Sequence, residues 1–132
     1  MHVKHRVWIY LKPDDVAFLD IIGGLIGTSS GHEQIEFTIK LCRLIIPDAR
    51  IVPHILSKIS LDTNNTGEVK RGVSIRYWVY LNDDDMKYLE EFSRAMKIKS
   101  RSKVIRYVIK IVKLFLSNTE IVSKTVKETL ME

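Results

Sequence analysis

The chain has 132 residues, of which 45% are apolar and 28% charged, and its net charge is +5. This length fits one domain, or two very small units that share a core, and the composition is typical of an ordinary soluble globular protein. No apolar run approaches the roughly eighteen residues of a membrane-spanning helix, and the first residues lack the apolar core of a signal peptide. We therefore expect a soluble, cytoplasmic protein.

The charge is unevenly distributed along the chain. Residues 1–70 carry eight Lys or Arg and eight Asp or Glu, which cancel, whereas residues 71–132 carry thirteen against eight and hold the whole excess of five. A localised basic surface favours a polyanionic partner such as nucleic acid. The single cysteine, Cys42, has no metal-type ligand spacing around it, so we expect it to be a small buried apolar residue.

Residues 1–46 predict a strand followed by two helices. The strand is expected over residues 6–11, where strand-forming residue types precede a Lys-Pro-Asp-Asp sequence typical of a helix start. Apolar residues then recur at helical spacing up to Ile26. A polar turn at residues 27–30 separates this helix from a second one, which begins at a serine cap.

Residues 47–72 predict a linker that contains a helix. The segment "DARIVPHILSKISL" has helical spacing despite Pro53, and "DTNNTGEVKRG" is expected to be a polar connector.

Residues 73–117 repeat the pattern of residues 1–46. An offset of seventy residues pairs 5–46 with 75–116 without a gap and gives twelve identities, where about two or three would arise by chance. The identical pairs are Arg6/Arg76, Trp8/Trp78, Tyr10/Tyr80, Leu11/Leu81, Asp14/Asp84, Asp15/Asp85, Leu19/Leu89, Ser30/Ser100, Ile35/Ile105, Ile39/Ile109, Lys40/Lys110 and Leu44/Leu114. We call 1–46 the first copy and 73–117 the second copy of a strand–helix–helix unit. In the second copy Asn82 or Asp83 is the expected cap of the first helix, and Ser100 that of the second.

Residues 118–132 predict a last amphipathic helix. Asn118 is expected to cap it, and the helical spacing directs Ile121, Val122, Val126 and Leu130 towards the core.

The two strand–helix–helix copies, with "SRSKVIR" at residues 100–106, resemble the ribbon-helix-helix DNA-binding proteins, the family of the Arc and methionine repressors. Tandem copies rich in isoleucine also look similar to transcription regulators of archaeal viruses. The resemblance implies a mostly α fold with a two-stranded antiparallel β-ribbon, in which the two repeats form an intrachain pseudo-dimer, plus extra linker and C-terminal helices. A swapped dimer, in which each strand pairs with its own copy in a second chain, is the alternative.

In this family one face of the ribbon packs on the helices and the other face reads bases in the major groove. Side chains alternate along a strand, and Leu81 leads into the helices, so its face should point inward. The expected base-contacting residues on the other face are Arg6, Trp8, Tyr10, Arg76, Trp78 and Tyr80. Cross-strand packing of the tryptophans, or a bulge that turns them inward, is the alternative.

The resemblance also implies that the second helix of each copy contacts phosphate, since free N–H groups and the helix dipole attract anions there. The expected phosphate-contacting residues are Ser30 in the first copy and Ser100, Arg101, Ser102 and Lys103 in the second. The first copy lacks the two cations, because Gly31, His32 and Glu33 follow its serine. Both serines are also expected N-caps.

Together these features predict a sequence-specific, double-stranded DNA-binding transcription regulator. We expect no enzyme activity, no cofactor, no metal and no evident small-molecule ligand, because no catalytic or ligand-binding motif is present. The expected partners are DNA and a second copy of the chain, in a homodimer or higher assembly on DNA in the cytoplasm, which is the host's if the protein is viral. An antitoxin-like protein-binding module and a DNA-associated virion structural protein are alternatives.

Overall fold

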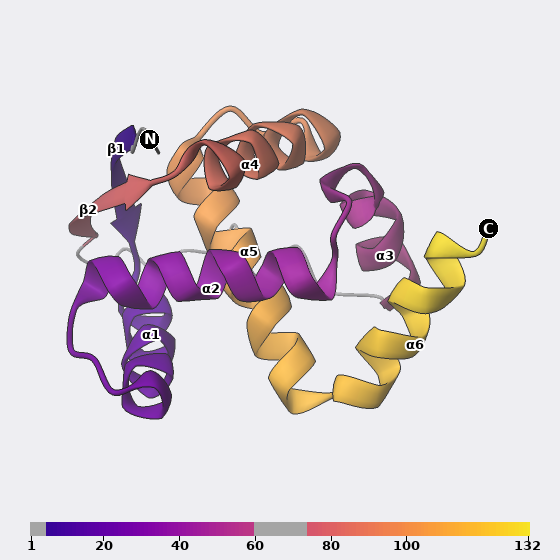
Figure 1. Ribbon diagram of the computed structural model, residues 1–132, viewed down its shortest axis with the longest axis horizontal. Coiled ribbons are helices and arrows are strands. Elements are labelled where there is room, and N and C mark those ends of the chain that lie inside the picture. Colours follow the sequence, from indigo (N-terminus) through magenta and orange to yellow (C-terminus); the bar gives the residue numbers. More distant parts are fainter. Residues whose placement is uncertain (1–4, 60–73) are drawn as a thin grey trace.

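The computed structural model describes residues 5–59 and 74–132. Within these ranges the chain is mostly helical, with six α-helices, one short 3-10 helix and a two-stranded antiparallel sheet (Figure 1). In chain order the elements are β1 (His5–Leu11), α1 (Pro13–Ile26), α2 (Gly31–Ile45), η1 (Ala49–Ile51), α3 (Val52–Ile59), β2 (Ile75–Leu81), α4 (Asp83–Met96), α5 (Arg101–Ser117) and α6 (Thr119–Leu130). The predicted connector "DTNNTGEVKRG" lies outside the described residues.

The two strands form one antiparallel ribbon, which we call the β1–β2 ribbon. Its register runs without a bulge and sets Trp8 opposite Trp78, Arg6 opposite Tyr80, and Tyr10 opposite Arg76. The inner face is the one predicted from Leu81, because Val7, Ile9, Leu11, Val79 and Leu81 are all buried. The predicted alternation is therefore confirmed, and the alternative of a bulge that turns the tryptophans inward is wrong.

The helix starts depend on polar side chains, as predicted. Asn82 Oδ1 accepts a hydrogen bond of 2.8 Å from the backbone N–H of Asp85, so Asn82 is the cap of α4. Ser30 and Ser100 cap α2 and α5 in the same way, each through a bond of 3.3 Å to an N–H group in the first helical turn. Such caps satisfy N–H groups that have no partner inside the helix.

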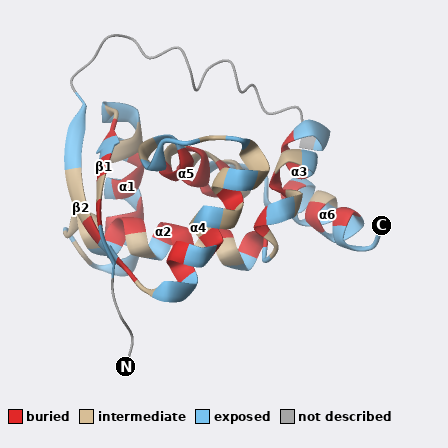
Figure 2. Ribbon diagram, turned by 90° about the horizontal axis from the view of Figure 1, so that it is seen from above, coloured by how far each residue is buried: buried red, intermediate tan, exposed pale blue. Residues whose placement is uncertain are grey.

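The core is one cluster that all the helices share. The helices α2 and α5 pack across each other, with the β1–β2 ribbon at one end of the molecule and α3 and α6 at the other (Figures 1 and 2). Cys42 is fully buried in this cluster, as predicted, and burial raises the pKa of its thiol to about 12. The neighbouring Tyr88 hydroxyl donates a 2.8 Å hydrogen bond to the carbonyl of Ile46, so its polar end is satisfied.

The predicted face of the last helix is partly wrong. Val122 and Val126 are buried as expected, but Ile121 is 58% exposed and Leu130 is 52% exposed, while Thr129 is buried instead. The helix α6 packs against α3 with the face that contains Thr129, where Lys58 Nζ donates to Thr129 Oγ1 at 3.3 Å and also contacts the carboxylate of Glu132. Asn118 occupies the N-cap position of α6, as predicted, but its side chain makes no capping hydrogen bond.

Two repeated aspartates connect the copies to each other. Asp85, at the start of α4, is fully buried and accepts from Arg43 Nη1 at 2.6 Å and from Lys40 Nζ at 3.0 Å, both on α2. Its equivalent, Asp15 of α1, accepts from Arg106 Nε of α5 at 2.9 Å. The sequence predicted only a helix-start role for these residues. In the structure each one also ties the first helix of one copy to the second helix of the other.

Candidate nucleic-acid interface

The outer face of the β1–β2 ribbon carries six side chains, and they are the six residues predicted to contact bases. They form the opposed pairs Arg6–Tyr80, Trp8–Trp78 and Tyr10–Arg76, so that equivalent residues are arranged symmetrically about the two tryptophans. Tyr10 is 49% exposed and Tyr80 is 43% exposed, both arginines are exposed, and the tryptophans are half-buried. The fold thus gathers aromatic and cationic side chains on one accessible surface.

The tryptophans organise this surface by packing across the ribbon. Their indole rings lie against each other at its centre. The guanidinium carbon of Arg6 lies 3.2 Å from the ring centre of Trp78, and that of Arg76 lies 3.6 Å from the ring centre of Trp8. Such cation–π contacts contribute about 0.5–1 kcal/mol at exposed sites. The predicted alternative of cross-strand tryptophan packing is therefore present on the same face that displays the arginines.

Two hydrogen bonds fix the second helices of both copies against the ribbon. The backbone N–H of Tyr10 donates to Ser102 Oγ of α5 at 2.8 Å, and that of Tyr80 donates to His32 Nδ1 of α2 at 3.1 Å. Positions 32 and 102 are equivalent under the seventy-residue offset. Ser102 was predicted as a phosphate contact, whereas the role of His32 was missed. The signal that could have found it is its alignment with Ser102.

These bonds also show that both edges of the ribbon are covered. The N–H groups of Tyr10 and Tyr80 point away from the opposite strand, so the start of α5 covers the free edge of β1 and the start of α2 covers that of β2. A peptide that binds by adding a strand needs a free edge. The edges are therefore closed to strand addition, which leaves the outer face as the accessible surface of the ribbon.

The residues predicted to contact phosphate lie at these two helix starts, and the two starts differ in charge. The cations Arg101 and Lys103 are exposed at the start of α5, next to Ser100 and the partly buried Ser102. At the start of α2 only Ser30 occupies an equivalent place, and Glu33 is the exposed charged residue of that turn. The oxygens of both capping serines accept N–H groups of their own helices. The α5 side of the ribbon is therefore cationic and the α2 side is not.

Within residues 5–59 and 74–132, no group of three or more His, Cys, Asp or Glu side chains is arranged to hold a metal ion. Over the same ranges, none of the helices combines the length and the apolar character needed to cross a membrane. The ribbon with its two flanking helix starts is the candidate interface for nucleic acid.

Comparisons with protein-family models, with curated proteins and with solved structures found no match to this chain. The functional interpretation consequently depends on the chain's own geometry: a two-stranded ribbon with an aromatic and cationic outer face, and two helix N-termini fixed at its edges.

Proposed function

We propose that the chain is a sequence-specific regulator of transcription that binds double-stranded DNA, with its two copies paired as a ribbon-helix-helix pseudo-dimer. The observation that supports this most is the outer face of the β1–β2 ribbon, where the arginine, tryptophan and tyrosine of each copy meet symmetrically. The major groove of B-DNA, about 12 Å wide, admits a two-stranded ribbon. Arg6 and Arg76 would bond guanine, and the aromatic rings would contact thymine methyl groups.

The helix starts at the ribbon edges would contact the phosphates on either side of the groove. Backbone N–H groups at a helix N-terminus bind phosphate without base preference, and added cations strengthen the contact. Arg101 and Lys103 supply two cations at α5, whereas α2 has Glu33 in the corresponding turn. The two half-sites should therefore be similar in sequence, and the half next to α5 should be held more tightly.

A protein partner is the second candidate, and a different surface favours it. At the end of the molecule opposite the ribbon, an apolar hollow between α2, α5 and α6 is lined by exposed side chains, among them Leu44 (78%), Leu130 (52%) and Met131 (77%). Exposed apolar surface of this kind marks protein contacts. The occupant of this hollow would be either a second copy of the chain bound to neighbouring DNA or an unrelated protein. Sedimentation with and without DNA would distinguish the two, because only the first gives self-association on DNA.

Selection from a random double-stranded DNA library, followed by footprinting at physiological salt, tests the proposed function. The expected result is one protected sequence with two similar half-sites and unequal protection of their phosphates. A variant with Lys113→Ala and Lys124→Ala is a matched control, because these exposed cations lie on the C-terminal part of α5 and on α6, away from the ribbon. Equal binding to all sequences would overturn the regulator and favour a packaging protein, and no binding to DNA would overturn both.

A further inference from the structure

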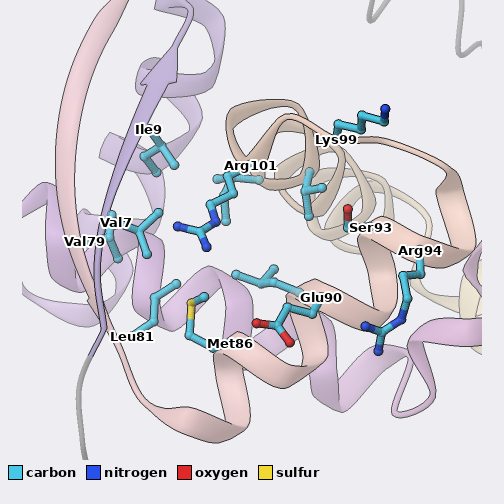
Figure 3. A pocket seen from close by; sticks show the side chains of 13 residues that line it. Val7, Ile9, Val79, Leu81, Met86, Glu90, Ser93, Arg94, Lys99 and Arg101 are labelled. Atoms are coloured by element: carbon cyan, nitrogen blue, oxygen red, sulfur yellow. The ribbon is translucent and has the colours of Figure 1, made fainter.

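A pocket of about 240 Å³ opens between the inner face of the β1–β2 ribbon, α4 and the start of α5 (Figure 3). Its floor is apolar and includes the buried side chains of Val7, Met86 and Val104. Its rim is charged and exposed, with three cations, Arg94, Lys99 and Arg101, against one anion, Glu90. An apolar floor with a few polar groups at the mouth is typical of small-molecule sites.

The two copies differ at an inward position that borders the pocket. Val7 lies here, and its equivalent in the second copy is Tyr77. The ring of Tyr77 fills the corresponding space in the other half of the molecule, where a Cβ on Gly31 would lie only 2.4 Å from Tyr77 Cε1. Burial, together with the charge of Asp20, raises the pKa of the Tyr77 hydroxyl. Asp20 is the equivalent of Glu90, which lines the pocket. The ring of Tyr77 therefore lies in the filled half at the place that is open in the other half.

A second difference between the copies adds a cation to the open half. Arg101 takes the position that Gly31 has in the filled half. Figure 3 shows the Arg101 side chain extending into the pocket towards Val7 and Met86, whereas Lys99 points away from it. No ion pair to Arg101 occurs among the residues that the structure describes. A guanidinium at the mouth of an apolar pocket is suited to a carboxylate, which it binds through two parallel hydrogen bonds.

We propose that this pocket binds a small monocarboxylate with an apolar body. The apolar part lies against Val7, Met86 and Val104, and the carboxylate lies on Arg101. The volume is below the roughly 300–1,000 Å³ of sites for drug-sized ligands, which limits the ligand to a short fatty acid or a small aromatic acid. A regulatory consequence rests on the proposed function: the bound carboxylate neutralises Arg101, a cation that the α5 phosphate contact would use, and so weakens DNA binding.

Calorimetric titration of the full chain without DNA tests the site directly. Octanoate is the linear probe, indole-3-acetate is the aromatic probe, and octanol is the neutral control. We expect one of the acids to bind with a single site per chain, and which one binds distinguishes the two ligand classes. Octanol should bind at least roughly tenfold more weakly, as should the acid to Arg101→Gln, because a hydrogen bond to a charged group is lost in both cases.

Two variants exploit the filled half of the molecule as a control. Val7→Tyr reproduces its packing and should abolish binding, whereas Tyr77→Val opens the matching space beside Gly31, which has no cation, and should not create a second site. If Val7→Tyr does not fold, Arg101→Gln decides, since its side chain is exposed. The proposal is overturned if neither acid binds the natural chain, if octanol binds as tightly as the acid, if Arg101→Gln or a folded Val7→Tyr binds undiminished, or if Tyr77→Val gains a second site.

The DNA-dependent part is measured separately, as the affinity for the selected site with and without saturating acid. We expect the acid to weaken binding by the natural chain and to have no effect on Val7→Tyr. Acid binding without any DNA binding would overturn the proposed function and leave the pocket standing. DNA binding without acid binding would overturn the pocket alone, and acid binding that leaves DNA affinity unchanged would overturn its regulatory role.

Discussion

Two neighbouring residues on β2, Tyr77 and Trp78, have different surroundings. One faces the core and the other lies on the surface proposed to contact DNA. Tyr77 faces inward beside Gly31 of α2, whereas Trp78 lies on the outer face between Trp8 and the guanidinium of Arg6. Because side chains alternate on a strand, one step along β2 exchanges the helix-facing surface for the proposed DNA-facing surface. Substitutions at these two positions should therefore have different effects.

Replacement of Arg76 or Trp78 by alanine should weaken binding to the selected DNA site by about 1–3 kcal/mol per lost base contact. The fold should remain, although Trp78→Ala also removes the contact with Trp8, and such an aromatic pair contributes about 0.5–1.5 kcal/mol. Fluorescence anisotropy gives the affinity, and thermal denaturation gives the stability. Tyr77→Ala is the matched control and should mainly lower the thermal midpoint. The prediction fails if Trp78→Ala unfolds the protein more than Tyr77→Ala does, or if it keeps full affinity.

The alternation of the strands could be predicted from the sequence, because its period of two leaves a single choice once Leu81 is directed inward. The tertiary partners of individual residues could not. The burial of Asp85 depends on Lys40 and Arg43, which lie more than forty residues away. The pocket beside Val7 likewise follows from the absence of a ring that its equivalent supplies elsewhere. Such features require knowledge of which elements meet in space.

At the scale of the elements, the first helix of each copy ends in the same left-handed backbone conformation. Gly27 has φ +78° after α1, and its equivalent Lys97 has φ +57° after α4. A residue with a side chain is disfavoured there, by roughly 1–2 kcal/mol, whereas glycine adopts the conformation without this cost. The first copy thus has the preferred residue at this helix end, and the second copy does not.

Gly27→Ala should therefore destabilise the protein by about 1 kcal/mol, since open space surrounds Gly27 and only the backbone conformation opposes the change. Lys97→Gly should stabilise it by less than about 1 kcal/mol, because glycine also increases the conformational freedom of the unfolded chain. Urea denaturation measures both changes. A shift of both midpoints in the same direction would contradict the conclusion that the left-handed backbone conformation determines both effects.

The start of α5 can be tested through its salt dependence. Alanine at both Arg101 and Lys103 should lower the affinity for all DNA sequences alike. It should also reduce the slope of log affinity against log salt by about 1 for each lost phosphate contact, because fewer counterions are released. The exposed cations Lys113 on α5 and Lys124 on α6, changed to alanine, should leave the slope as it is. An unchanged slope in the Arg101 and Lys103 variant would exclude a phosphate role for both.

The element that the sequence predicted least well is α6, for a physical reason. Its apolar residues permit more than one buried face, and the choice depends on what it packs against. It packs against α3 with the face that contains Thr129, which bonds to Lys58, and this arrangement leaves Leu130 exposed. The caps of α2, α4 and α5, in contrast, are local and were predicted correctly, because each depends on residues within one helical turn.

At the scale of the whole molecule, the duplication has two consequences. Pairing of β1 with β2 within one chain covers the apolar helix faces of both copies in one core. It also makes one chain present two similar but unequal halves, which differ at the start of α2 and α5 and in the space beside Val7 and Tyr77. A symmetric dimer of single copies would have two identical halves. The proposed DNA site should therefore have halves that are alike but not equivalent.

Engineered cysteines can distinguish this pairing from a swapped dimer. Arg6 and Tyr80 face each other, and the N–H of Tyr80 bonds to His32 instead of the opposite strand, so they form a closely spaced pair without ladder hydrogen bonds. The Cα atoms of such pairs are about 4.5 Å apart, which a disulfide can span. Cys42 should not interfere, because it is buried and the pKa of its thiol is raised to about 12.

Oxidation of Arg6→Cys with Tyr80→Cys at low protein concentration should give a cross-linked monomer on a denaturing gel. The matched control joins Arg6→Cys with Tyr10→Cys. In a swapped dimer centred on Trp8, residue 6 of one chain would face residue 10 of the other, since Tyr10 is the equivalent of Tyr80. This control should therefore form no dimer if the strands pair within the chain. Dimers from the control, with no cross-linked monomer from the first pair, would instead mean that each ribbon joins two chains. The DNA site would then contain two true palindromes in place of one unequal pair of half-sites.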